Sequence, residues 1–379
     1  MSDTKEKKYF VFQTGCGVNK ANARRYENYM EANGVKPTTD VKEADYIVIN
    51  TCAVDQRSIL EAAINISRST ITHPKNPEVV VVGCLVDRDR AFIERMFHGP
   101  ILDLNEIEEN PDIFQFNGVA LAGEHPYFFP KEPGYVFDSG KPADYYGLIN
   151  ICTGCLHRCT YCTHHMIFDE IISLPPEKIV ALVQEGIDRG VREFILWAQD
   201  IYAYGKDNGA DIVSLLKKLV ALSGDFSLNL GGMNPKWLPK VIDPFTELLE
   251  TGRIIKMEFP IQTGSPRLLK LMGRRYDEDK LVETIARFKE AHPPLMVHTH
   301  AMLGFPTETE VDVLETARVL RRAGFTSVSI FAFTPHRETK AGNMDGRIPA
   351  NEIRRRFKLL EQELKGSNIY VINYVQFPG

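Results

Sequence analysis

Residues 148–162 read Leu-Ile-Asn-Ile-Cys-Thr-Gly-Cys-Leu-His-Arg-Cys-Thr-Tyr-Cys, an apolar run followed by closely spaced cysteines. The apolar run has the composition of a buried strand. Cys155, Cys159 and Cys162, called here the loop cysteines, then follow with the spacing C-x3-C-x2-C. A short loop of this kind can place three thiolates on one face of a cubane iron–sulfur cluster and leave the fourth iron without a protein ligand. An open iron is a place where a reagent can bind.

With the aromatic residue Tyr161 before the last cysteine, this spacing resembles the signature of the radical S-adenosylmethionine (SAM) superfamily. The resemblance implies a 4Fe–4S cluster on the loop cysteines, whose open iron chelates SAM. One electron from the cluster would split SAM into a 5′-deoxyadenosyl radical. The alternative is a structural zinc or disulfide site, but three thiols lack a fourth zinc ligand and disulfides are rare inside cells.

Composition and charge favour an intracellular enzyme of two domains. The chain has 379 residues, of which 44% are hydrophobic and 25% are charged, enough to bury substantial cores. It has no apolar stretch long enough to cross a bilayer and no signal-peptide core, so we expect a cytoplasmic location and no membrane partner. The net charge is −5, whereas a chain that holds a long RNA by its phosphates more often has a basic excess.

Three further cysteines each follow a hydrophobic run near the N-terminus. Cys16, Cys52 and Cys84, called here the strand-end cysteines, come after runs that begin at residues 9, 46 and 79. Helical patterns follow over residues 21–32, 57–68 and 88–96. Strand, loop and helix repeated in this way predict an α/β domain with a flavodoxin-like parallel sheet, whose carboxyl edge binds ligands.

The position of the strand-end cysteines can be interpreted in two ways. A single cysteine behind a strand is often only a small buried side chain. Three cysteines at equivalent strand ends would converge on one edge of the sheet, and this favours a second metal cluster. The pair Gly15 and Gly17 lacks the third glycine of a dinucleotide-binding fingerprint, because Lys20 stands there.

A stretch rich in Gly, Pro and aromatic residues separates two regions of alternating pattern. We expect a first domain over residues 1–120, a linker over 121–145, a second domain over 146–366 and a short tail over 367–379. Six strand–helix units with right-handed crossovers should close the second domain into a partial (β/α)6 TIM barrel, with the cysteine loop at its carboxyl-terminal mouth. The expected strands are 146–152, 193–198, 226–231, 254–261, 295–303 and 327–333, and the expected helices are 176–189, 211–222, 239–250, 279–291, 308–323 and 350–364.

A longer series of ordered motifs spans roughly residues 8 to 364. By these motifs the chain resembles the methylthiotransferases, the radical SAM branch that inserts a sulfur and a methyl group at an unactivated carbon of a tRNA base or a ribosomal-protein side chain. The motifs are Thr14-Gly-Cys16 with Asn19, Asn50-Thr-Cys52-Ala-Val, Gly83-Cys84-Leu, Gly154 to Cys162, Gly190-Val-Arg-Glu, Ile261-Gln-Thr-Gly-Ser265, Leu269 to Arg274, and Gly304-Phe-Pro-Thr-Glu308.

The resemblance implies that the strand-end cysteines hold an auxiliary 4Fe–4S cluster that delivers sulfur, while the loop cysteines generate the radical. Sulfur insertion needs a hydrogen-atom abstractor and a sulfur source close to the same carbon. We therefore expect the two clusters to face a shared cavity, with SAM also serving as methyl donor. An electron donor such as flavodoxin or ferredoxin, and a sulfur donor, are the expected partners.

Four residues are candidates for contact with SAM. Tyr161 would lie beside the adenine, and Gln199, Gln262 and Gly304 would contact the ribose, the methionine and the adenine through the backbone. The glutamines could instead cap loop amides at strand ends.

Three residues near the loop are expected to have other roles. His164 and His165 are expected to line the mouth rather than bind iron, since the loop cysteines already complete the ligand set. Cys152 is expected to be a buried strand cysteine.

Departures from the family concern the substrate more than the reaction. Residues 168–175, Phe-Asp-Glu-Ile-Ile-Ser-Leu-Pro, stand where the family has R-G-x-x-x-S-R-P, so both arginines are replaced. The usual S-x-R-x-G-T appears as Thr-Pro-His-Arg-Glu-Thr at 334–339. Only one strand's worth of residues follows Gly366, where the family has an RNA-binding TRAM barrel, so we expect that this barrel is either truncated or naturally absent. These losses weaken the case for a tRNA substrate, since arginines bind the phosphates of RNA. Apolar and aromatic residues around the mouth would suit a small molecule or a peptide, or would be ordinary packing: Met166, Phe168, Trp197, Tyr202, Tyr204 and Met233.

Three functions remain open from the sequence. The favoured function is sulfur insertion, as a methylthio group, into a small molecule or peptide. The second is a tRNA or ribosomal-protein methylthiotransferase whose recognition module is truncated or supplied by a partner. The third is a non-catalytic iron–sulfur protein that relays electrons or acts as a sensor, and it would not need the Gly304–Glu308 element.

Overall fold

The structure is a computed structural model that describes residues 6–12, 17–53, 56–103, 106–107, 111–116, 127–130 and 145–374. The chain divides into two compact units, Met1–Tyr127 and Phe128–Gly379, and each is described by itself. In the part of the chain that the structure describes, no helix has both the length and the apolarity needed to cross a membrane.

The first unit contains a parallel sheet in the strand order β2-β1-β3-β4-β5. This is the order of flavodoxin-like doubly wound sheets, so the predicted fold class is confirmed for this unit. The strands are β1 (Lys8–Phe12), β2 (Lys36–Pro37), β3 (Tyr46–Thr51), β4 (Glu78–Gly83) and β5 (Ile101–Leu102), and the helices are α1 (Gly17–Ala32), α2 (Gln56–Thr70) and α3 (Cys84–Glu94).

Helices cover both faces of this sheet because the central strands are apolar on both sides. Ile47 and Ile49 of β3 share a core with Ile66 of α2. Val48, between them in the sequence, belongs to a second core that includes Tyr26 of α1. Successive side chains of a strand point to opposite faces, so a continuous apolar run gives a strand buried on both sides.

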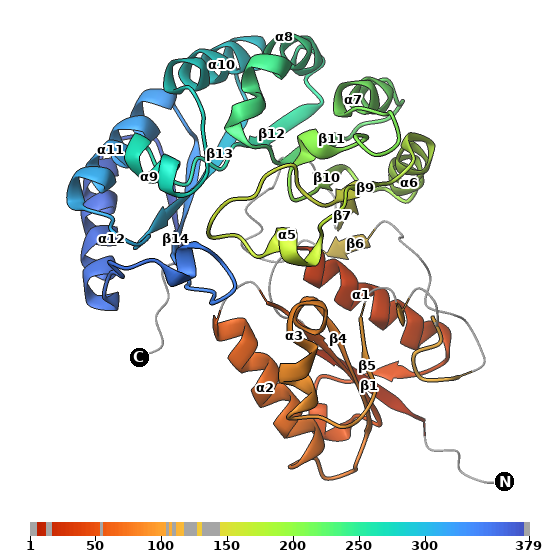
Figure 1. Ribbon diagram of the computed structural model, residues 1–379. Coiled ribbons are helices and arrows are strands. Elements are labelled where there is room, and N and C mark those ends of the chain that lie inside the picture. The colour runs from red at the N-terminus through yellow and green to blue at the C-terminus, as the bar shows by residue number, and fades with distance from the viewer. Residues whose placement is uncertain are drawn as a thin grey trace, which may run out of the picture. The chain divides into compact units, whose positions relative to one another are not determined.

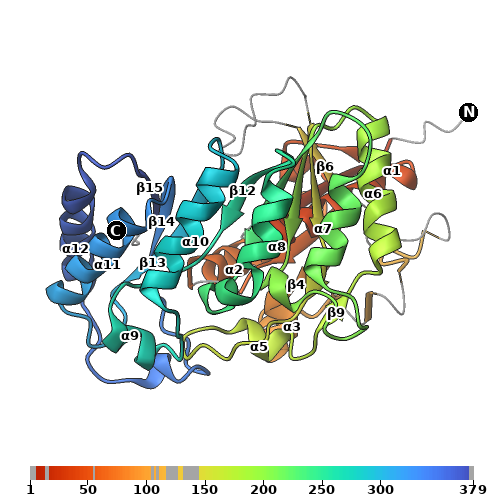
Figure 2. The ribbon, with the colours of Figure 1, turned by 90° about the horizontal axis from the view of Figure 1, so that it is seen from above.

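The second unit is built on one sheet in the order β15-β14-β13-β12-β11-β10-β7-β6, with helices along its outer face (Figures 1 and 2). The six strands predicted for the partial barrel are all present as neighbours. The strands are β6 (Tyr127–Pro130), β7 (Tyr145–Asn150), β10 (Glu193–Trp197), β11 (Ser227–Gly232), β12 (Ile254–Glu258), β13 (Met296–Leu303), β14 (Ser327–Ala332) and β15 (Tyr370–Tyr374), and the outer helices are α6 (Pro176–Asp188), α7 (Ile212–Val220), α8 (Leu238–Leu249), α10 (Glu278–Ala291), α11 (Glu310–Ala323) and α12 (Ala350–Leu364).

Two edge strands lie outside the predicted set. Strand β6 comes from the stretch expected to be a linker, and β15 comes from the expected tail and pairs in parallel with β14. The short helices α5 (His164–Ile167) and α9 (Pro266–Leu271) and the two-stranded pair β8 (Cys152–Thr153) and β9 (Ile172–Ser173) were also not predicted. These elements are too short to show a period in the sequence.

The two faces of the second sheet differ in polarity. In β13, Val297, Ala301 and Leu303 pack in the core beneath the helices. His298 and His300 alternate with them and face the inner side of the curved sheet. The inner side therefore carries titratable groups, while the helix-facing side is apolar.

Replacing Leu320 with alanine should destabilise the second unit by about 2–5 kcal/mol, because this side chain of α11 is fully buried in the main core. Leu314→Ala is the matched control on the same helix, since Leu314 is 40% exposed. It should cost about 1 kcal/mol or less. Urea unfolding followed by circular dichroism would measure both, and equal losses would contradict the assignment of the core face.

Candidate functional site

The loop cysteines follow a constrained turn at the carboxyl end of β7. The backbone N–H of Ile151 donates to Trp197 O at 2.9 Å, which continues the pairing of β7 with β10. Gly154 then has a φ of +88°, and a Cβ at this position would lie 2.1 Å from Glu170 O. Only glycine fits such a position, so the turn that introduces Cys155 depends on it.

The middle of the loop is held by segments from the far side of the sheet. Thr160 accepts and donates three hydrogen bonds with remote residues. Its N–H donates to Met272 O at 3.0 Å, its hydroxyl donates to Leu271 O at 2.8 Å, and its carbonyl accepts from the N–H of Ala341 at 2.9 Å. The loop is therefore fixed by contacts that exist only when the whole second unit is folded.

The three loop thiols are neighbours, and they are shielded from water. Burial raises the pKa of Cys155 to about 12 and that of Cys162 to about 11, and in each case the adjacent Cys159 contributes. Backbone N–H groups oppose these shifts: that of His157 at Cys155, and those of His164 and His165 at Cys162. Such N–H groups stabilise anionic sulfur, and a bound metal displaces the thiol protons. The residues present thus fit a metal cluster.

Arg274 lies beside the loop. Its Nη1 is 3.6 Å from Cys159 Sγ, and its Nη2 donates to the carbonyl of Pro260. The residue is 8% exposed. A guanidinium donor at a thiol that would bind metal is a recognised way of tuning such a site.

A buried carboxylate anchors the first half of the loop. Asp200, which follows β10, lies 3.1 Å from His157 Nε2 and accepts a hydrogen bond of 2.8 Å from Trp237 Nε1. Tyr202 stacks on Trp237 with ring centroids 4.3 Å apart. These contacts connect the loop to the ends of β10 and β11.

The structure places the two glutamine candidates at strand ends on the same edge as the loop. Gln199 follows β10, and its Oε1 is buried without a hydrogen-bond partner among the described residues. Gln262 has a φ of +70° and pairs through its backbone with β13, where Met302 N–H donates to its carbonyl at 2.7 Å. An orphaned buried acceptor and a strained backbone are both features of ligand-binding edges.

The two other SAM candidates are built into the fold. Gly304 has a φ of +81°, and its N–H donates to Glu308 Oε1 at 3.0 Å, so an adenine contact would use its carbonyl. Tyr161 is partly buried against an apolar cluster that includes Met272 and Phe305. This packing orients the ring beside the loop cysteines.

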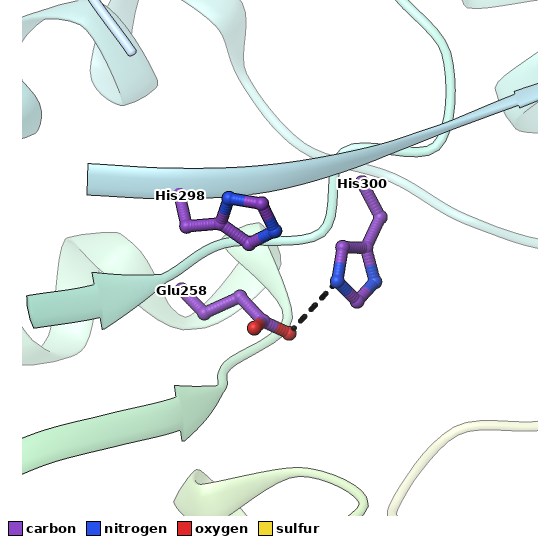
Figure 3. A group of neighbouring side chains, drawn as sticks. All are labelled: Glu258, His298 and His300. Atoms are coloured by element: carbon purple, nitrogen blue, oxygen red, sulfur yellow. Dashed lines mark ion pairs between the residues drawn. The ribbon is translucent and has the colours of Figure 1, made fainter. Parts of the chain in front are cut away.

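A polar group that the sequence analysis missed lies on the inner face of the sheet. Figure 3 shows Glu258 at the end of β12 and His298 and His300 on β13. His300 Nε2 is 3.4 Å from Glu258 Oε1, and the ligand atoms of all three residues lie within 4.8 Å of one another. The combination of two imidazoles and a carboxylate is one that metals accept.

Hydrogen bonding of His298 argues against a metal at this group. Its Nδ1 lies 2.7 Å from Ser327 Oγ and its Nε2 lies 3.1 Å from Ser329 Oγ. Burial, with Lys256 and His300 nearby, lowers its pKa to about 2, so the ring is neutral. His298 is thus already satisfied, and Glu258 and His300 remain as partly exposed polar groups that face the interior of the barrel.

The other predicted mouth residues range from exposed to fully buried, and Phe168, Trp197 and Tyr202 are partly buried. Met166 is 42% exposed, whereas Tyr204 and Met233 are fully buried. The Tyr204 hydroxyl donates to Leu174 O at 2.9 Å. Burial raises the pKa of Cys152 to about 12, as expected for a strand cysteine that stays protonated. Tyr204 and Met233 are therefore packing residues.

In the first unit, two strand-end cysteines follow paired residues of neighbouring strands. Thr51 of β3 pairs with Gly83 of β4, so Cys52 and Cys84 come next at the same carboxyl edge. Cys52 is 2% exposed, and Cys84 is partly exposed. Cys16 lies outside the described residues. Placement of Cys52 and Cys84 at one edge agrees with the interpretation of the sequence, while their role as ligands stays a prediction.

Sequence reasoning missed the partners of the loop because they are remote. Asp200 and Arg274 carry no spacing signal that relates them to the cysteines. Glu258 and His300 had a signal that could have been used, since charged residues recur with a period of two in strands that are otherwise apolar.

Two family models match the chain. The model of the radical SAM superfamily matches residues 149–320, and the model of the uncharacterized protein family UPF0004 matches residues 8–101. Among curated proteins, the chain is 30% identical to the ribosomal protein uS12 methylthiotransferase RimO of Carboxydothermus hydrogenoformans over 369 residues, which covers 93% of this chain and 82% of that protein.

Further relatives carry related names. The chain is 28% identical to a probable threonylcarbamoyladenosine tRNA methylthiotransferase of Pyrococcus abyssi, over 94% of this chain and 83% of that protein. Among solved structures, the radical SAM methyltransferase TsrM of Kitasatospora setae matches with a TM-score of 0.59 at 14% identity, over 89% of this chain and 77% of that one. The structural match shows the fold alone.

Gly154→Ala should prevent assembly of the loop while leaving the sheet folded, because the added Cβ would collide with the Glu170 carbonyl. Gly190→Ala is a matched control: this glycine also has a φ of +88°, but a Cβ there would meet no atom within 4 Å. Both variants carry backbone strain of about 1–2 kcal/mol. Iron content and circular dichroism would separate them, and equal iron in the two variants would refute the constraint.

Proposed function

Because the chain belongs to the radical SAM methylthiotransferases, we propose that it inserts a methylthio group at an unactivated C–H carbon of a tRNA base or a ribosomal-protein side chain. The observation that carries the proposal is the loop of three neighbouring thiols, one buried and two partly buried, which is fixed at the carboxyl edge of a barrel-like sheet. Its reaction class follows from the family.

The loop cysteines would hold the radical-generating 4Fe–4S cluster. When bound, this cluster supplies the electron that cleaves SAM. The chain's own contribution is to shield the thiols partly from water, to direct N–H groups at them and to hold Thr160 in place. Tyr161, Gln199, Gln262 and Gly304 would contact SAM, and the unpartnered Oε1 of Gln199 supports this for that residue.

The strand-end cysteines would hold the auxiliary 4Fe–4S cluster and deliver the sulfur. Cys52 and Cys84 follow paired residues at the ligand-binding edge of a flavodoxin-like sheet, which supports their part in this assignment. An external one-electron donor, such as flavodoxin or ferredoxin, and a sulfur donor complete the requirements. We also propose that the protein acts in the cytoplasm.

A macromolecular substrate is now favoured over the small molecule preferred from the sequence. The relatives are named for a ribosomal protein or for tRNA. Two of the aromatic and apolar residues that suggested a small substrate, Tyr204 and Met233, are fully buried and cannot line a site. Close to the loop cysteines, exposed Leu156 and Ile172 instead offer surface that a macromolecule could cover.

Mass spectrometry would test the substrate. We expect tRNA nucleosides or ribosomal-protein peptides from cells with the gene to carry an added CH2S unit that is absent from cells without it. The purified, cluster-loaded enzyme with SAM and dithionite should restore the modification, and its Cys155→Ser variant should not. If both pools are unchanged while a metabolite gains sulfur, the macromolecular substrate is wrong.

Substitutions of single cysteines should separate the two clusters. The anaerobically loaded protein should hold about eight irons, and Cys155→Ser should hold about four and release no 5′-deoxyadenosine. Cys152→Ser is the matched control, since Cys152 belongs to strand β8 and lies outside the C-x3-C-x2-C spacing, so it is not expected to bind iron. It should keep about eight irons.

The auxiliary cluster has its own variant. Cys52→Ala with Cys84→Ala should hold about four irons and still release 5′-deoxyadenosine, but should form no methylthio product. Iron analysis and product chromatography give both readings. A double variant that retains full methylthio transfer would rule out sulfur delivery from these cysteines. A wild-type protein that releases no 5′-deoxyadenosine would point to the electron relay.

A further inference from the structure

Arg274 is a buried cation whose charge requires an anion. It follows α9, and 92% of its surface is removed from water, since 8% remains exposed. A buried charge is strongly unfavourable unless it is paired and hydrogen-bonded. A buried arginine is therefore normally compensated by an ion pair with a neighbouring anion.

No carboxylate fills this role within the part of the chain that the structure describes. Nη2 of Arg274 donates to a neutral carbonyl, that of Pro260. Nη1 is directed at Cys159 Sγ, at 3.6 Å, and Nε is buried without a hydrogen-bond partner. The guanidinium therefore faces the Cys159 sulfur and the Tyr161 hydroxyl, neither of which is a carboxylate.

We propose that Arg274 is the electrostatic partner of the cluster on the loop cysteines and raises its reduction potential. This inference rests on the proposed function for the presence of that cluster. Through Nη1 the residue donates to the Cys159 thiolate. Arg274 acts through the cluster ligand and is a positioning residue.

The direction of the effect follows from charge. Reduction adds one electron to the cluster, taken from an external one-electron donor, and no bond within Arg274 changes. The reduced cluster and its thiolates carry one more negative charge than the oxidised form. A fixed positive charge at low dielectric stabilises the more negative state, and hydrogen bonds to the sulfurs act in the same direction. Loss of the guanidinium should make reduction harder.

The test is a dithionite titration followed by electron paramagnetic resonance of the cluster-loaded protein. The signal of the loop cluster is identified because SAM, which binds its open iron, alters that signal. Arg274→Met should lower the equilibrium constant for its reduction at least tenfold, which corresponds to about 59 mV for a one-electron couple. Arg274→Lys, which keeps the charge, should show a smaller loss.

Arg275→Met is the matched control, because Arg275 is the adjacent residue, carries the same charge and is exposed. Its potential should equal that of the wild type. Should Arg274→Met fail to fold by circular dichroism, Arg274→Gln, which retains an amide donor for Pro260, is judged by the same criterion.

The possible results separate the two proposals. A loaded Arg274→Met variant with an unchanged potential, or an Arg275→Met variant with an equal shift, would overturn the role of Arg274. A wild-type protein without a SAM-sensitive signal would instead overturn the assignment of the loop cysteines.

Discussion

The second unit depends on one constraint: three thiols must be kept close together, away from water, at the open edge of a parallel sheet. Nearby buried thiols resist ionisation, as the raised pKa values of Cys155 and Cys162 show. Three features of the fold position and surround these thiols: a glycine turn that admits no side chain, N–H groups directed at sulfur, and Arg274 beside Cys159. Together these features describe a receptacle for a metal cluster whose thiolate ligands are negatively charged.

Much of the fold was predictable because its strands are apolar and regularly separated by helices. The six strands of the partial barrel and the three strand–helix units of the first unit came from such runs, and their observed bounds differ by a few residues. Strand β6 was missed because it lies in a Pro- and aromatic-rich stretch without alternation. The loop cysteines were predictable because their spacing is local.

Features that depend on tertiary contacts were not predictable. Arg274 belongs to a motif recognised in the sequence, but its approach to Cys159 joins residues 115 positions apart. Tyr204 and Met233 were proposed for the mouth because their strand ends are there, whereas their side chains point into the core. Glu258 and His300 are placed by strand pairing between β12 and β13 and give the barrel a polar interior. A substrate held there would meet both a carboxylate and an imidazole.

The attachment of Thr160 has a consequence for how the protein matures. Its hydroxyl bonds to Leu271, 111 positions later in the chain, and its carbonyl bonds to Ala341 near the end of the sheet. Contacts so distant in sequence form late during folding, since long loops must close first. During synthesis the cysteines therefore emerge well before their final surroundings exist. At that stage the cysteines lie on an unstructured peptide that cannot hold iron in place. Insertion of the inorganic centre therefore belongs among the last events of biogenesis, when the polypeptide is almost fully folded.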